Sequence, residues 1–107
     1  MYAVIFEVHP KTKLAAQEYF DLAAELRTEL EEIEGFISVE RFSSLSDEDK
    51  FLSISFWRDE KALKQWREQH QHRKAQEKGR GEIFKDYRII VAKVIRDYGI
   101  TNRKEAP

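Results

Sequence analysis

Histidine is the residue type in this chain best suited to proton transfer, because imidazole titrates near neutral pH. The sequence has three: His9, His70 and His72. His70 and His72 are two residues apart, so a helix would turn their side chains about 200° from each other and they could not bind one metal ion together. One of them could still face a pocket while the other is solvated. His9 precedes Pro10 at the end of a predicted strand and is expected at the surface.

Aromatic residues could form the walls of a cavity for a flat or aromatic ligand. Two tryptophans and two residues near the last predicted strand make up this set: Trp57, Trp66, Phe84 and Tyr87. If the second predicted helix packs on the sheet, these rings converge beside His70 or His72. Small Ser53 and Ser55 on one face of a strand would leave space there. The competing interpretation is an ordinary aromatic core.

Motifs of the common enzyme classes are absent from the sequence. It has no glycine-rich phosphate-binding loop, no G-x-S-x-G and no H-E-x-x-H. With zero cysteines it also lacks a thiol nucleophile, a disulfide framework and any thiolate ligand for zinc or an iron–sulfur cluster. The nucleophiles that remain are serine and threonine hydroxyls beside a base.

The elements that must position these residues follow from the hydrophobic period. Apolar and β-branched residues at 2–9, 36–42, 51–57 and 87–98 predict four strands, and a repeat of three to four residues over 13–34 predicts a helix ended by Gly35. A second helix is capped by Asp59, and its extent past Trp66 stays open because the apolar stripe thins there. The order β-α-β-β-α-β predicts a ferredoxin-like α+β fold, an antiparallel four-stranded sheet with both helices on one face.

The predicted strands are apolar on both faces. In the first strand Val4 and Phe6 alternate with Ala3 and Ile5. Two helices cover only one face of a four-stranded sheet, and the other face would expose an apolar patch larger than monomers usually carry. We therefore expect two sheets to pack face to face in a homodimer.

Size, charge and hydropathy bound the class of protein. The 107 residues predict one domain over 1–98 and a polar C-terminal tail over 99–107. The net charge of −1 combines 5 basic and 12 acidic residues in 1–57, 10 basic and 6 acidic in 58–88, and 4 basic and 2 acidic in 89–107. This pattern indicates solvated helix faces, and a sequence pI near 6.3 opposes nucleic-acid binding. With no membrane-spanning run and no targeting signal, we expect a cytoplasmic protein that binds neither nucleic acid nor membranes.

Four segments of the chain resemble the antibiotic biosynthesis monooxygenase (ABM) domain family. They are E-G-F-I-S-V-E-R-F at 34–42, L-S-I-S-F-W-R-D-E-K-A-L-K-Q-W-R at 52–67, H-R-K-A-Q at 72–76 and D-Y-R-I at 86–89. The G-F that opens the second strand, the W-R-D-E motif and the second tryptophan are specific in combination, and the likeness extends over 2–98. The resemblance implies a dimeric α+β barrel of ferredoxin-like subunits, which agrees with the expected homodimer.

The resemblance implies two kinds of chemistry. Some members oxygenate aromatic polyketides or quinols without metal, flavin or haem, and the substrate anion itself reacts with oxygen. Others bind and degrade haem, with an asparagine in the first strand, a tryptophan in the second helix and a histidine ten residues later. Trp66 matches that tryptophan, but Gln76 stands ten residues on and the sole asparagine is Asn102. Haem degradation by that scheme disagrees with the sequence, although His70 or His72 as a substitute ligand stays open.

The residues and the resemblance together predict a cofactor-independent monooxygenase for a small aromatic molecule, a phenol or a quinol. His72 is the predicted base, and no metal site is predicted. The predicted substrate-binding residues, whose arginines would steady a developing oxyanion, are Trp57, Trp66, His70, Tyr87, Phe84, Arg41 and Arg88. A non-catalytic small-molecule-binding domain is the alternative, because fold does not fix function, and haem binding is the third interpretation.

Overall fold

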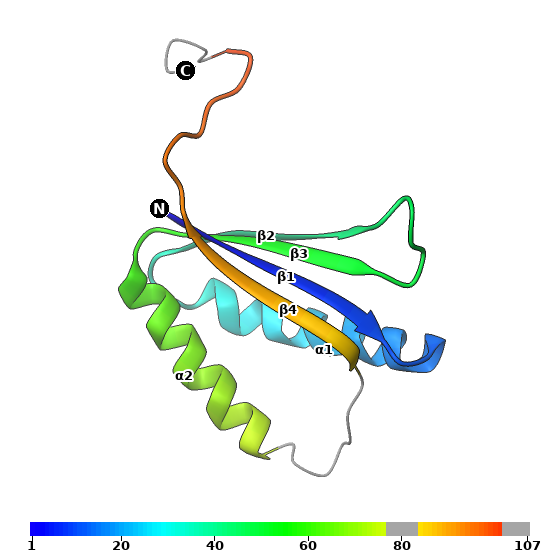
Figure 1. Cartoon of the computed structure of the whole chain (residues 1–107). Coiled ribbons are helices and arrows are strands. Elements are labelled where there is room, and N and C mark those ends of the chain that lie inside the picture. The colour runs from blue at the N-terminus through cyan, green and yellow to red at the C-terminus, as the bar shows by residue number, and fades with distance from the viewer. Residues whose placement is uncertain (77–83, 102–107) are drawn as a thin grey trace.

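The computed structural model describes residues 1–76 and 84–101, and its elements have the predicted order. They are β1 (Tyr2–Pro10), α1 (Lys13–Glu31), β2 (Phe36–Ser43), β3 (Phe51–Trp57), α2 (Glu60–Gln76) and β4 (Phe84–Lys93). Figure 1 shows both helices on the same side of one sheet. The strand order is β2-β3-β1-β4 and every neighbouring pair is antiparallel, which confirms the ferredoxin-like α+β fold.

Polar caps and one glycine set where the helices begin and end. The Thr12 hydroxyl accepts a hydrogen bond from the Ala15 N–H at 3.0 Å and so caps α1. Helix α1 ends at Glu31, three residues before the predicted end, because 32–34 already form the turn into β2. Gly35 has a φ of +97°, so the left-handed conformation predicted for it is confirmed.

The sequence left the length of helix α2 open, and the structure defines it. The Asp59 carboxylate accepts from the Ala62 N–H at 2.9 Å and caps the helix, as predicted. The helix then continues without a break to Gln76, although its apolar stripe thins after Trp66. One helical register therefore holds from the second tryptophan through both histidines of this segment.

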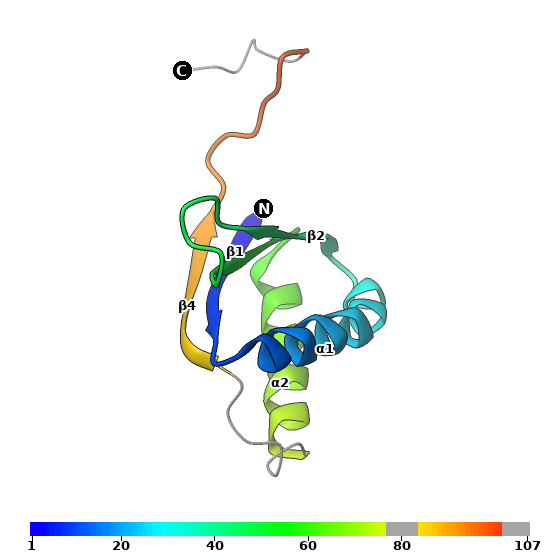
Figure 2. The ribbon, with the colours of Figure 1, turned by 90° about the vertical axis from the view of Figure 1, so that its right-hand side faces the viewer.

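Strand β4 differs from the prediction at both ends, since it covers Phe84–Lys93 rather than 87–98. Its end is set by its partner, because Tyr2 at the start of β1 pairs with Lys93 and leaves no further strand to pair with. The Val94 N–H makes one more bond, to the Met1 carbonyl at 3.0 Å. Figures 1 and 2 show the chain leaving the sheet after this point, with Ile95 83% exposed and Ile100 84% exposed.

The two faces of the sheet have different surroundings. On the helix side, Leu30, Ile33, Trp57 and Ala62 form a buried cluster. Figure 2 shows both helices on this side and none on the other. We call the other side the open face; the register assigns it Ala3, Ile5, Glu7, Ser38, Glu40, Phe42, Leu52, Ile54, Phe56, Arg88, Ile90 and Ala92. Of the helices described, neither is long and apolar enough to cross a membrane.

Candidate functional site

The helix side of the sheet is organised in four rows that run across the strands. Directly opposite residues of antiparallel strands point to the same face, so the register defines each row. In the order β2, β3, β1 and β4 the rows are Phe36–Trp57–Tyr2–Lys93, Val39–Ser55–Val4–Val91, Arg41–Ser53–Phe6–Ile89 and Ser43–Phe51–Val8–Tyr87. These rows place three predicted site residues, Trp57, Arg41 and Tyr87, on the helix side of the sheet.

The β4 ends of three rows form an apolar strip that the helices do not cover. Tyr87, Ile89 and Val91 are 54%, 57% and 59% exposed, although they share a face with the buried core. Their neighbour Val8 on β1 is fully buried. We call these three residues the β4 strip; it offers an apolar surface, partly walled by aromatic rings, to a small molecule.

Trp57 and Trp66 lie together at the first row. Trp57 is 1% exposed, its ring stacks on Trp66 at 6.5 Å between centroids, and Phe36 packs edge-on at 5.3 Å. Trp57 is therefore part of the core, and Trp66 is the half-buried member of the pair. Tyr2 belongs to the same row; burial, and then the negative charge and hydrogen bond of Glu60, raise the pKa of its phenol and keep it protonated.

Phe84 and Tyr87 belong to a second aromatic group at the other end of the sheet. Their rings lie 5.8 and 6.0 Å from the ring of Phe6. Tyr19 of α1 completes the group, at 6.3 Å from Phe6 and 5.6 Å from Phe84. All of these contacts are edge-on, an arrangement that favours aromatic packing.

The two groups do not converge in the way the sequence predicted. Trp57 pairs with Tyr2, and Tyr87 pairs with Val8, so the groups are six residues apart along β1, or about 20 Å. The reason is the antiparallel order: β3 ends where β1 begins, and β4 begins where β1 ends. Phe84 and Tyr87 can line one end of a helix-side site, and Trp66, which stacks on Trp57, lies at the other end.

The two small serines do not leave an empty space. The Ser55 hydroxyl accepts a hydrogen bond from the Trp57 indole N–H at 2.9 Å, inside the core. Ser53 lies between Arg41 and Phe6 in the third row, and both of these neighbours contact the Tyr19 ring. The expected cavity above the serines is thus occupied by side chains, and the uncovered surface lies at β4.

Tyr19 is a candidate site residue that the sequence did not single out. It is 6% exposed, and the Arg41 guanidinium carbon lies 5.9 Å from the centroid of its ring. The Tyr19 hydroxyl and the Arg41 Nε are both buried and have no hydrogen-bond partner. The signal in the sequence was a phenol in the apolar stripe of α1, since a buried tyrosine hydroxyl normally finds a partner.

Arg88 lies on the open face and not with the aromatic groups. Its guanidinium Nε donates to the Glu7 carboxylate at 2.6 Å, and Lys50 lies 3.0 Å from the other oxygen. Hydrogen bonds from Lys50, then from Arg88, lower the pKa of Glu7. The two predicted oxyanion residues, Arg41 and Arg88, are therefore on opposite faces of the sheet.

The histidines predicted to act in the site are on α2, and the side chains of 70–76 lie outside the described residues. The helical register still places their positions. Position 70 is four residues after Trp66 and shares its face of the helix. Position 72 is six residues after Trp66, about 240° around the axis. The register thus favours His70 over His72 as the neighbour of Trp66.

His9 was expected at the surface, and its side chain is only partly exposed and makes a hydrogen bond. Its Nε2 lies 3.0 Å from an Asp47 carboxylate oxygen, its side chain is 30% exposed, and this hydrogen bond lowers the pKa of Asp47. Among the described side chains, those of 1–69 and 84–101, no three histidine, aspartate or glutamate residues are grouped so that they could hold a metal ion.

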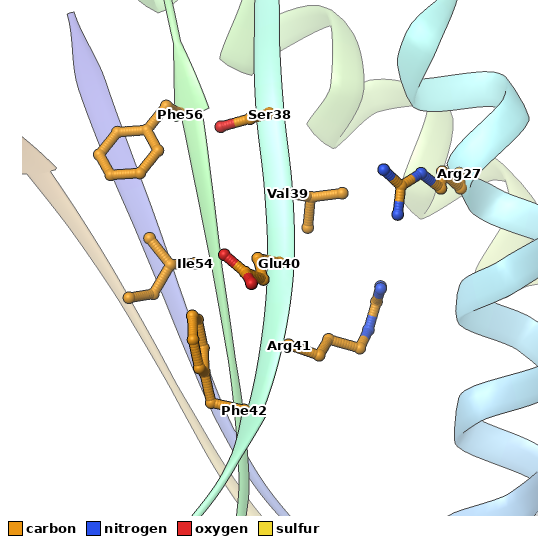
Figure 3. Close-up of a pocket in the computed structure, with 8 residues that line it drawn as sticks. All are labelled: Arg27, Ser38, Val39, Glu40, Arg41, Phe42, Ile54 and Phe56. Carbon is orange, nitrogen blue, oxygen red and sulfur yellow. The ribbon is translucent and has the colours of Figure 1, made fainter.

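A hollow of about 490 Å³ lies at the edge strand β2 (Figure 3). Its lining residues alternate between the two sides of the strand, as strand geometry requires. Arg27, Val39 and Arg41 lie on the side toward α1, and the others belong to the open face. Arg27 also forms an exposed ion pair with Glu31 at 3.3 Å.

Comparison with known proteins gives three findings. The family model described as antibiotic biosynthesis monooxygenase matches residues 1–78. The jasmonate monooxygenase ABM of Pyricularia oryzae is 47% identical over 94 residues, which are 88% of this chain and 43% of that protein. The chain thus spans less than half the length of this curated relative.

Two solved structures share the fold at low sequence identity. A MhuD variant with two manganese protoporphyrin IX molecules per active site has a TM-score of 0.74 at 14% identity, covering 92% of this chain and 99% of that one. SnoaB of Streptomyces nogalater, a cofactor-independent oxygenase, has a TM-score of 0.70 at 12% identity, covering 90% and 94%. At these identities the likeness establishes the fold alone.

Proposed function

The chain belongs to the antibiotic biosynthesis monooxygenase family, and from this premise we propose that it oxygenates a small aromatic molecule, a phenol or a quinol, on the helix side of its sheet. The observation that carries the proposal is the β4 strip. Its three apolar side chains face the helices and are still more than half exposed. A surface of this kind beside aromatic rings suits a flat ligand.

The proposed reaction uses no cofactor. A base removes the proton of a quinol hydroxyl, and an unsubstituted ring carbon of the resulting phenolate, which carries part of the negative charge, reacts with molecular oxygen. One oxygen atom stays on that carbon and the other leaves as water, so a quinol and oxygen give a hydroxyquinone and water, and atoms and electrons balance without a reductant. The protein then has to bind, take a proton and exclude water. The description of SnoaB as cofactor-independent supports this chemistry for the fold.

The roles of the site residues follow from their positions. Trp66, Phe84 and Tyr87 are the proposed walls, while Trp57 holds Trp66 in place from the core. The sequence favours His72 as the base, and the register of α2 favours His70 because it shares the face of Trp66. We propose that one of these two histidines takes the proton.

We propose that two copies associate through the open face. Its central row is Glu40–Ile54–Ile5–Ile90. The three isoleucines of this row are only partly buried. An isologous dimer would cover this row twice, once on each copy. The exposed Ile95 and Ile100 lie on a segment that continues from the edge of the same sheet.

Oxygen uptake tests the proposed function directly. Purified protein is incubated with a panel of quinols and polyphenols, together with jasmonate, the carboxylic acid in the name of the curated relative. We expect uptake with at least one quinol, and a loss of at least about tenfold in His70→Ala or in His72→Ala. Leu14→Ala, on an exposed position of α1, is the matched control. Ligand binding without uptake across the panel would favour the non-catalytic binding domain.

A haem titration tests the third interpretation. The MhuD structure contains two metalloporphyrins per active site, so the fold can bind such a ligand. In this chain Gln76 stands where the resemblance places a histidine. We expect no shift of the Soret band on adding the protein to haem; a saturable shift lost in His70→Ala would instead favour haem binding.

A further inference from the structure

We propose that the α1 side of the hollow at the edge strand β2 binds a small organic carboxylate and that Arg41 is its anchor. This site is separate from the β4 strip. The third row places Arg41 three strands away from Ile89, about 14 Å across the sheet. The proposal therefore adds a ligand class and a second binding surface to the proposed oxygenase.

Arg41 differs from Arg27, Arg58 and Arg88, which have carboxylate partners, and it is less exposed than Arg67 of α2, which has none among the described residues. Arg27 pairs with Glu31 at 3.3 Å, Arg58 with Asp59 at 2.9 Å, and Arg88 with Glu7. Among residues 1–76 and 84–101, Arg41 has no carboxylate partner, although 1–57 contain 12 acidic residues. A partly buried guanidinium without a counter-ion is unusual, because burial of an unpaired charge costs stability.

Two buried donor atoms, one on Arg41 and one on Tyr19, lack a hydrogen-bond acceptor. They are the Arg41 Nε and the Tyr19 hydroxyl, and the guanidinium lies over the Tyr19 ring. In the proposed complex, one group that only accepts hydrogen bonds satisfies both donors, since the two side chains are in contact, with the guanidinium carbon 5.9 Å from the ring centroid. Tyr19 is 94% buried, so its hydroxyl lacks a partner inside the protein and not at the solvent-exposed surface.

The hollow supplies the access and the remaining contacts. Figure 3 shows Val39 and Arg41 of β2 pointing toward α1, and Arg27 of α1 pointing back toward β2. Arg27 brings a second cation, since its pair with Glu31 is exposed on both sides and therefore weak. Glu40 lines the same hollow but belongs to the open face, on the other side of the strand.

These features select a carboxylate with an apolar body over other anions. The planar guanidinium fork matches the two oxygens of a carboxylate. Val39 lines the hollow and offers an apolar contact, which an inorganic phosphate could not use. A neutral amide of the same shape would keep the apolar contacts and lose the ion pair.

The test compares benzoate with benzamide by isothermal titration calorimetry. We expect benzoate to bind at least about tenfold more tightly than benzamide, and Arg41→Gln to abolish this difference. Tyr19→Phe keeps the ring and is expected to weaken benzoate binding severalfold. Arg96→Gln, on an exposed arginine of the C-terminal segment, is the matched control and should bind as the wild type.

The outcomes separate this proposal from the proposed function. Equal binding of benzoate and benzamide, or full benzoate binding in Arg41→Gln, would overturn the carboxylate site. Phosphate binding as tightly as benzoate would also overturn it, because the apolar contacts would then have no role. The calorimetry needs no turnover, so a protein without oxygenase activity can still confirm the site, and an active oxygenase can still refute it. Thermal melting shows that each variant is folded.

Discussion

Glu7 and Arg88 connect β1 to β4 on the open face through a charged hydrogen bond of 2.6 Å. The Glu7 side chain is only 15% exposed, and Lys50 approaches its second oxygen at 3.0 Å. Two cations thus surround one carboxylate on a sheet face whose other residues are mostly apolar. If that face is an interface between copies, the pair is enclosed there and the carboxylate must stay ionised.

The pH dependence of stability follows from this carboxylate. Its folded pKa is lowered from 4.5 by Lys50 and Arg88, so the folded state favours the ionised form. Its contribution is present above about pH 4.5 and is lost as the pH falls through the lowered folded pKa. Urea unfolding between pH 3 and 7 should show that the free energy of unfolding falls less at acid pH in Glu7→Gln than in the wild type.

Other carboxylates also make the free energy of unfolding depend on pH in the acid range, so Glu7→Gln removes only part of this dependence. The pKa of Asp47 is lowered by its hydrogen bond to His9, and that of Asp59 by the Ala62 N–H and Arg58. We therefore expect Glu7→Gln to reduce the slope without flattening it. Glu18→Gln, at an exposed position of α1, should leave the slope unchanged; an identical slope in Glu7→Gln would contradict the assignment.

Gly35 is required by both its conformation and its neighbour. Its φ of +97° is costly for any other residue, and a Cβ at this position would lie 2.8 Å from the Ala62 Cβ. Gly35→Ala should lower the free energy of unfolding by about 2 kcal/mol, from backbone strain and the clash at the start of α2. Urea denaturation measures this, and the double variant Gly35→Ala with Ala62→Gly should recover the part due to the clash.

The fold was predictable because its signals are local and repeated. Strand and helix periods, Asp59 before a helix, and Gly35 after one depend on neighbouring residues alone. The end of β4 was not predictable in this way. Its apolar alternation continues past Lys93 to Ile95, but β1 offers no partner there, and pairing is a property of two strands.

The site was harder to predict because it depends on register between distant segments. The sequence could list Trp57, Tyr87 and the arginines, but not which end or face of the sheet each would occupy. A shift of one residue in β4 would move Arg88 to the helix side. Tyr19 was missed because an apolar stripe does not distinguish a packed phenol from one whose hydroxyl lacks a partner.

The proposed dimer depends on the open face and can be broken at its centre. Ile54→Asp places a charge in the middle row and should convert the dimer to a folded monomer, measured by sedimentation equilibrium. Leu14→Asp, on an exposed α1 position, is the control and should stay dimeric. Deleting 94–107 removes exposed Ile95 and Ile100 and should weaken association if they contact the second copy. A wild-type monomer at all concentrations would refute the dimer.

The hydrogen bond between the Trp57 indole and the Ser55 hydroxyl should be a measurable part of core stability. It is 2.9 Å long, and Trp57 is 1% exposed. Ser55→Ala leaves a buried N–H without an acceptor and should cost about 1–3 kcal/mol in urea unfolding. In a Trp57→Phe background that N–H is absent, so the same serine substitution should cost about 1 kcal/mol less. Equal costs in the two backgrounds would mean that the bond contributes nothing and that Ser55 is selected for size alone.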